Sequence, residues 1–174
     1  MENYNDKIVL VDINDNIIGK KNKLDAHTKP LLHRAFSIFL YHDDKILIQK
    51  RAEGKYHSGG KWANSCCSHQ RFNEEFMESA SRRLFEELKV KCDLEEISSF
   101  VYFTKFSEEM YEYEYDHVLI GEYSGDFVLD KEEASEAKWI SIKELSNNLQ
   151  LYPEIYSSWF KIAAPMVIKY LNAK

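Results

Sequence analysis

The spacing of hydrophobic residues changes at Asn73, and this change limits the folds that the chain can adopt. Before Asn73, apolar and polar residues alternate, which is typical of β-strands. After it, apolar residues recur about every fourth position, at Phe76, Ala80, Leu84 and Leu88. This pattern predicts an amphipathic helix over 74–88 with Asn73 as its N-cap. Because strands occur on both sides of this helix, we expect an α/β fold in which helices cover a mixed sheet.

The other elements follow from the same patterns. We expect strands at 7–12, 17–21, 97–106, 111–123 and 137–141, and a long hairpin over 35–51 that turns at Asp43 and Asp44. Residues 52–72 contain three glycines and predict a loop region. Two helices are expected near the end, over 141–149 and 154–172, with Pro165 as a kink in the second.

Composition limits the class of protein. A length of 174 residues with 44% hydrophobic residues fits one domain over 1–174. The net charge of −6 argues against binding to nucleic acid, and no apolar run has the length of a membrane span. Three cysteines, at 66, 67 and 92, are too few for a disulfide framework. We therefore expect a cytoplasmic protein, most simply a monomer, without nucleic-acid or membrane partners.

Histidines and carboxylates suggest a metal site. His27, His33 and His69 lie near the glycine-rich region or the strand before it. Glu112 and Glu114 are two apart on an expected strand, so their side chains share a face, where a cation would relieve their repulsion. Three imidazoles and two carboxylates would suit an octahedral divalent ion. The alternatives are ordinary surface histidines and a solvated acidic strand.

The helix over 74–88 carries a second group of charges. Arg83 and Glu87 are four apart, as are the neighbouring Arg82 and Glu86, and such pairs are common on helix surfaces. Alternatively, Glu87 could hold a magnesium ion that bridges a diphosphate. An acidic protein must attract phosphate locally, and basic residues are available for this at Lys23, Arg51, Lys55 and Arg83.

The segment from Ser68 to Lys89 resembles the Nudix box. Its matching positions are Glu74, Arg82, Leu84, Glu86 and Glu87. Ser68 stands where the box has its first glycine, Arg83 where it has a glutamate, and Lys89 where it has its closing glycine. The resemblance implies a Nudix-type α/β/α sandwich with a mixed sheet in a single domain.

Five motifs together resemble type I isopentenyl diphosphate isomerase, a branch of the Nudix superfamily. They are AHT at 26–28, LHRAFS at 32–37, WANSCCSH at 62–69, RRLFEEL at 82–88 and EYE at 112–114. The resemblance implies interconversion of isopentenyl and dimethylallyl diphosphate. It also implies a divalent ion (Mn, Mg or Zn) at His27, His33, His69, Glu112 and Glu114, and a magnesium ion that joins Glu87 to the isoprenoid diphosphate.

The same resemblance assigns the remaining roles. It places the catalytic pair on Cys67 and Glu114, and an aromatic site on Tyr102 and Trp159. The substrate-binding residues that it implies are Lys23, Arg51, Lys55, Arg83, Tyr102 and Trp159. Glu114, with Tyr102 as a relay, would protonate the alkene, and Cys67 as a thiolate would remove a proton. Two other functions stay open: a Nudix hydrolase of a nucleoside diphosphate derivative, and a metal-stabilised binding protein without turnover.

Overall fold

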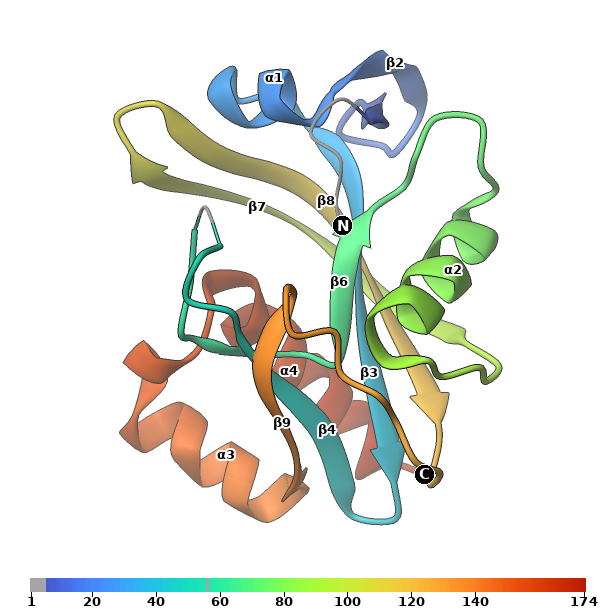
Figure 1. The fold of residues 1–174 in the computed structure, drawn as a ribbon, viewed down its shortest axis with the longest axis vertical. Coiled ribbons are helices and arrows are strands. Elements are labelled where there is room, and N and C mark those ends of the chain that lie inside the picture. Colours follow the sequence, from blue (N-terminus) through green and yellow to red (C-terminus); the bar gives the residue numbers. More distant parts are fainter. Residues whose placement is uncertain (1–5, 56) are drawn as a thin grey trace.

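The computed structural model describes residues 6–55 and 57–174 (Figure 1). Nine strands of this part of the chain form one mixed sheet. They are β1 (Lys7–Val11), β2 (Ile17–Asn22), β3 (His33–His42), β4 (Lys45–Arg51), β5 (Trp62–Ala63), β6 (Cys66–His69), β7 (Glu95–Ser107), β8 (Met110–Glu122) and β9 (Ala134–Ser141). The helices are α1 (Lys23–Thr28), α2 (Phe76–Leu88), α3 (Ile142–Leu151) and α4 (Ser158–Leu171), with a short 3-10 helix, η1 (Pro153–Ile155).

Strand β3 lies at the centre of the sheet and pairs with β1, β4, β6 and β8. Its pairing with β8 is parallel, whereas the other three pairings are antiparallel. In these registers His33 lies opposite Glu114, and Ser37 lies opposite Cys67. The sheet therefore brings the motifs at 32–37, 62–69 and 112–114 side by side.

Two helices cover opposite faces of the sheet (Figure 1). Leu84 and Leu88 of α2 pack with Phe36 and Cys66 on one face, whereas Phe160 of α4 belongs to the hydrophobic cluster on the other face. Full burial of one such leucine stabilises the fold by about 1.5–3 kcal/mol. The arrangement confirms the expected α/β/α class. In the described part of the chain, no helix has both the length and the hydrophobicity needed to cross a bilayer.

Helix α2 ends where the sequence predicted but begins two residues later. The helix starts at Phe76 with Glu75 as its N-cap, so the prediction that Asn73 caps a helix from 74 was wrong. Asn73 instead has a φ of 79°, in the left-handed region, which asparagine tolerates better than most residues. At the other end Lys89 has a φ of 58° and is the C-cap. Glycine is the usual residue there, as it is in the Nudix box.

The prediction of a loop over 52–72 was wrong in its second half. Residues 66–69 form β6 because they pair with β3, from Ile38 opposite Cys66 to Ala35 opposite His69. Cysteine and serine give a weak local strand pattern, so the tertiary pairing decides the conformation. Helix α1 was also missed, because its six residues carry too short a pattern to be recognised.

Two further elements required correction. The expected hairpin over 35–51 pairs only at its tip, where Tyr41 and His42 lie opposite Ile46 and Lys45. Beyond the tip each arm has other partners, since β4 pairs with β9 and β5. The expected helix over 154–172 is divided into η1 and α4, because Tyr156 between them is extended and buried and forms a bridge with Trp62. Helix α4 continues through Pro165.

Candidate active site and metal centre

A pocket opens on the α4 face of the sheet. It is bounded by β3, β6, β8, the segment after β4 and the first turn of α4. Of the residues singled out in the sequence, those that line it are Lys23, Arg51, Lys55, Cys67, His69, Glu112, Glu114 and Trp159. The sheet thus gathers basic, acidic, thiol and aromatic side chains around one cavity.

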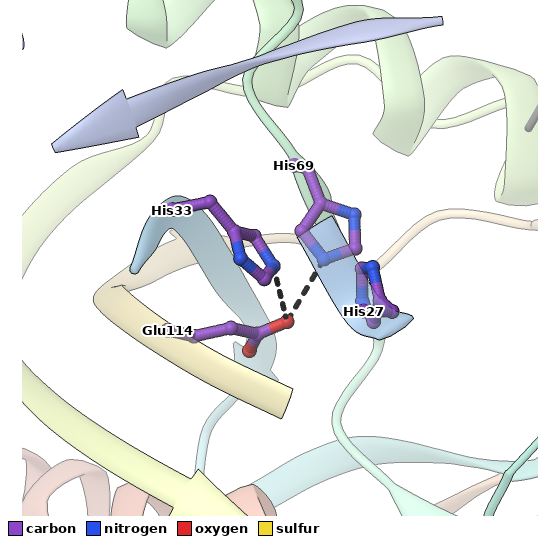
Figure 2. A group of neighbouring side chains, drawn as sticks. All are labelled: His27, His33, His69 and Glu114. Carbon is purple, nitrogen blue, oxygen red and sulfur yellow. Dashed lines mark hydrogen bonds and ion pairs between the residues drawn. The ribbon is translucent and has the colours of Figure 1, made fainter. Parts of the chain in front are cut away.

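Four predicted metal ligands meet beside this pocket (Figure 2). One ligand atom each from His27, His33, His69 and Glu114 lies within 4.8 Å of the others, and all four residues are buried. Nε2 of His69 lies 2.8 Å from Oε1 of Glu114, and Nε2 of His33 lies 3.5 Å from the same oxygen. Figure 2 shows the three rings, from α1, β3 and β6, gathered around the carboxylate from β8.

The hydrogen bonds of two rings fit a divalent cation. Nδ1 of His27 lies 2.7 Å from the carbonyl oxygen of Lys23, and Nδ1 of His33 lies 2.8 Å from that of Leu31. A carbonyl can only accept, so each Nδ1 carries the proton and each Nε2 carries the lone pair. Burial also lowers the pKa of His27 to about 2, with help from the two neighbouring imidazoles. Neutral imidazoles with oriented Nε2 atoms are the form that binds metal.

Glu112 lies outside this group of four. Its Oε2 accepts a hydrogen bond of 2.6 Å from the hydroxyl of Tyr102, and its Oε1 lies 2.6 Å from Nε2 of His57. Tyr102 also contacts Oε2 of Glu114 at 2.7 Å. The hydroxyl of Tyr102 thus joins the two glutamates, and the ligand role of Glu112 stays a prediction.

The neighbouring imidazoles of His33 and His69 shift the pKa of Glu114. Burial alone would raise the pKa of this carboxyl, but the two imidazoles outweigh burial and hold the pKa well below its usual range. For Tyr102, burial and the adjacent Glu112 both raise the pKa. The hydroxyl therefore keeps its proton beside an ionised carboxylate, which is the arrangement needed for a proton relay.

The two adjacent cysteines face opposite sides of the sheet. Cys67 lines the pocket, and Nη1 of Arg51 lies 3.8 Å from its Sγ. Cys66 is fully buried among the residues that pack on α2. Burial raises the pKa of both thiols, although Arg51 acts in the opposite direction on Cys67. The pocket side of the strand therefore presents Cys67 mainly as a thiol.

The predicted diphosphate residues form a charged network along one side of the pocket. Lys55 forms an ion pair with Glu133, and Arg83 forms one with Glu87 and another, at 3.4 Å, with Glu133. Arg83 lines a second, smaller pocket together with Lys23. Glu87 is buried and pairs with Arg83, but it is not among the residues that line the main pocket.

Three functional candidates were missed in the sequence: His57, Asp116 and Glu133, all of which line the pocket. Asp116 continues the alternation of Glu112 and Glu114, so this period of two was a usable signal. Burial and the charge of Glu114 raise its pKa well above normal, while Ser37 donates a hydrogen bond of 2.8 Å to its Oδ2. His57 and Glu133 lie in or next to loops and gave no local signal.

Comparisons with known proteins show the family of this chain. Residues 31–160 match the NUDIX domain family. The chain is 46% identical over 164 residues to "Isopentenyl-diphosphate Delta-isomerase 2" of Aromatoleum aromaticum, covering 94% of this chain and 87% of that protein. It is also 46% identical over 156 residues to a protein of the same description from Photorhabdus laumondii, covering 88% of each chain.

Solved structures support the same fold. The crystal structure of DR0079 from Deinococcus radiodurans has a TM-score of 0.75 at 17% identity and covers 91% of this chain and 97% of that chain. The MutT protein from Methanosarcina mazei has a TM-score of 0.65 at 17% identity, covering 82% and 96%. At such low identity these structures show the fold alone. The sequence relatives go further, and the chain belongs to the isopentenyl-diphosphate Delta-isomerase family of NUDIX-domain proteins.

Proposed function

We propose that the protein interconverts isopentenyl diphosphate and dimethylallyl diphosphate by moving a proton onto one carbon and removing one from another. The observation that carries this proposal is that Cys67 and Glu114 line one pocket. The hydroxyl of Tyr102 lies 2.7 Å from Oε2 of Glu114, which also belongs to a group of four side chains that could hold a metal ion. The names of the relatives support the same reaction.

Binding starts at the diphosphate. Lys23, Arg51 and Lys55 line the pocket and supply positive charge, and Arg83 lies in the adjoining pocket. A magnesium ion on the diphosphate would bind Glu87, which is held close by through Arg83. Charge-assisted contacts of this kind fix the position of the anion and leave the hydrocarbon end to enter the pocket.

Proton transfer then requires two groups on different sides of the hydrocarbon. In one direction Glu114, through Tyr102, protonates the alkene carbon to give a tertiary cation, and Cys67 removes a proton from the neighbouring carbon. In the other direction Cys67 donates and Glu114 accepts. Burial raises the pKa of Cys67, and the two imidazoles lower the pKa of Glu114, and both directions favour the forms that start this second direction. Each positioned acid or base contributes typically about 10²–10⁴ in rate.

The cation needs protection and stabilisation. The indole of Trp159 is almost fully buried beside Arg51 and lines the pocket. A desolvated cation on an indole face gains about 2 kcal/mol. Water must be kept from the cation during turnover, because it would trap the cation as an alcohol.

The histidine cluster would hold one divalent ion, Mn, Mg or Zn, through His27, His33, His69 and Glu114, with Glu112 as a fifth ligand. When bound, this ion supplies positive charge that orients Glu114 and offsets part of its negative charge. The protein would act in the cytoplasm as a monomer on this small isoprenoid diphosphate, without nucleic-acid or membrane partners.

The proposal is tested by incubating the purified protein with isopentenyl diphosphate and a divalent metal salt, and measuring dimethylallyl diphosphate and free phosphate together. We expect isomer without phosphate release. Phosphate without isomer would favour a Nudix hydrolase. Metal-dependent stability without either product would favour a binding protein.

A further inference from the structure

Asn64 joins the turn before β6 to the first turn of α4. Its side chain is fully buried, and its Nδ2 donates hydrogen bonds to the carbonyl oxygens of Ile38, at 3.2 Å, and Cys66, at 2.6 Å. Its Oδ1 accepts a hydrogen bond of 3.0 Å from Nε1 of Trp159. Because two carbonyl groups occupy the donor side of the amide, its acceptor side must face the indole.

The backbone around Asn64 supports the same junction. The amide of Ser157 donates a hydrogen bond of 2.9 Å to the carbonyl of Trp62, and Trp62 forms a parallel bridge with Tyr156. The two residues just before α4 therefore lie against Trp62 of the short strand β5. The side chain of Asn64 adds a further contact between the same two segments, because it binds Trp159, which lines the pocket.

The indole of Trp159 is held at its ring as well as at its N–H. The edge-to-face contact with His57 has a centroid distance of 5.7 Å and an interplanar angle of 87°. The guanidinium of Arg51 lies 5.1 Å from the indole centroid. These two contacts restrict the ring plane, whereas the bond to Asn64 fixes its rotation within that plane.

We propose that Asn64 is a positioning residue for the isomerisation, which holds the indole of Trp159 and the strand of Cys67 in one fixed relation. This inference rests on the proposed function. Asn64 binds the carbonyl of Cys66, the residue before Cys67, and the N–H of the indole that the proposed function places next to the cation. A shift of either group by a fraction of an ångström would weaken a reaction that depends on their geometry. Asparagine suits this position because one short side chain supplies two donors and one acceptor.

Ser65 provides a matched control. It is the next residue, it is also fully buried, and it bonds only to backbone of the sheet: its hydroxyl accepts from the amide of Leu40 at 2.8 Å and donates to the carbonyl of Leu47 at 2.6 Å. Ser65→Ala therefore removes two buried hydrogen bonds from the same turn without removing the partner of Trp159.

The first measurement is hydrogen exchange at the indole N–H of Trp159, followed by nuclear magnetic resonance. The chain has three tryptophans, and Trp159→Phe assigns the signal. Loss of a buried hydrogen bond opens the group to solvent, so Asn64→Ala should exchange at least about tenfold faster than the parent, whereas Ser65→Ala should exchange at the parental rate. Equal exchange in Asn64→Ala and the parent would overturn the proposal.

The second measurement separates kcat from KM. Asn64→Ala should lower kcat by about tenfold or more and leave KM within about twofold, because the diphosphate residues are untouched. In a Trp159→Phe background, Asn64→Ala should lower kcat much less, because the shared bond is already absent. Additive losses in kcat, or the same loss in Ser65→Ala, would show a merely structural role.

If Asn64→Ala does not fold, Asn64→Asp replaces it, because a buried, neutral carboxylic acid keeps an acceptor for the indole and one donor for a carbonyl oxygen. A protected indole N–H in Asn64→Asp then supports the proposal, and fast exchange contradicts it. A parent protein that makes no dimethylallyl diphosphate would refute the proposed function, while the exchange comparison would still decide whether Asn64 holds Trp159.

Discussion

His69 and Glu114 are 45 positions apart in the chain, yet Nε2 of the histidine lies 2.8 Å from Oε1 of the carboxylate. The contact exists because β3 pairs with β6 on one side and with β8 on the other, which places both side chains on the α4 face. His33 reaches the same oxygen from β3 itself. The metal cluster is thus a product of the pairing order of the sheet.

Replacing His69 by Ala should therefore weaken metal binding. Removal of a partner that only orients a ligand costs about 10–100-fold in affinity, so loss of the ligand should cost at least that much. Metal content after dialysis and isomer formation should fall together. His42→Ala is the control, since that side chain is 44% exposed at the β3–β4 turn. Unchanged metal content in His69→Ala would place the ion elsewhere.

The sequence predicted this cluster in part, for physical reasons. Alternation along a strand predicted that Glu112 and Glu114 share a face, and both do line the pocket. It could not predict that Glu114 meets the histidines whereas Glu112 meets Tyr102 and His57. That division depends on which strands pair, and local patterns do not encode pairing.

The fold shows the same division between local and tertiary information. The boundaries of α2 and of the aromatic strands β7 and β8 were predicted within a few residues, because each has a long hydrophobic pattern. Strand β6 was not, because its four residues form a strand only through pairing with β3. The bond from Asn64 to Trp159, across 95 positions, had no signal in the sequence for the same reason.

Glu87→Gln should weaken binding of the magnesium ion that accompanies the diphosphate. It should not change the metal content of the histidine cluster. Glu87 is buried against Arg83 and carries the negative charge that a diphosphate-bound magnesium would need. We expect the apparent KM for substrate and the magnesium requirement to rise by about tenfold or more. The control is Glu86→Gln, which removes a more exposed charge from the same helix; Glu86 pairs with Arg82 and, like Glu87, with Arg83. If metal content of the cluster falls in Glu87→Gln, the two sites are not separate.

Arg82→Gln should lower the free energy of unfolding at neutral pH but not in acid. Arg82 donates to both oxygens of Glu74, at 3.0 and 2.9 Å, and to both oxygens of Glu86. Although burial raises the pKa of each glutamate, the bonds and charge of Arg82, together with Ser79 and Arg71 at Glu74 and with Arg83 at Glu86, lower it by more. The unfolded chain therefore binds more protons in acid, and this stability is lost as the pH falls below the usual glutamate pKa of about 4.3.

Denaturant unfolding at several pH values checks this expectation. Arg82→Gln should lower the free energy of unfolding by about 1 kcal/mol near pH 7, since the ion pairs are partly exposed. The difference from the parent should shrink towards about pH 2. Lys105→Gln removes an exposed ion pair with Glu108 and should change little at any pH. If Arg82→Gln lowers the free energy of unfolding equally at both pH values, then the packing of the Arg82 side chain, and not its charge, stabilises this part of the fold.

Cys67→Ala and Glu114→Gln should each lower isomerisation by several orders of magnitude, whereas Cys66→Ala should change it little. The two cysteines lie on opposite faces of the sheet: Cys67 lines the pocket next to Arg51, and Cys66 packs with the residues that contact α2. Only Cys67 can exchange a proton with a ligand in the pocket. Removing one acid or base costs about 10²–10⁴ on its own. Because the reaction needs both groups in each turnover, the Cys67→Ala, Glu114→Gln double variant should be no slower than about the worse single variant.

Isomerisation in deuterated water tests the pair directly. With both groups intact, solvent deuterium should enter the methyl group in one direction and the internal methylene, next to the carbon that bears the diphosphate, in the other, because Glu114 and Cys67 exchange their protons with solvent between turnovers. Neither Cys67→Ala nor Glu114→Gln should incorporate label at the parental rate, while Cys66→Ala should. Label that enters at the parental rate in Cys67→Ala would show that another group removes the proton, and Asp116, buried in the same pocket, would be the next residue to replace.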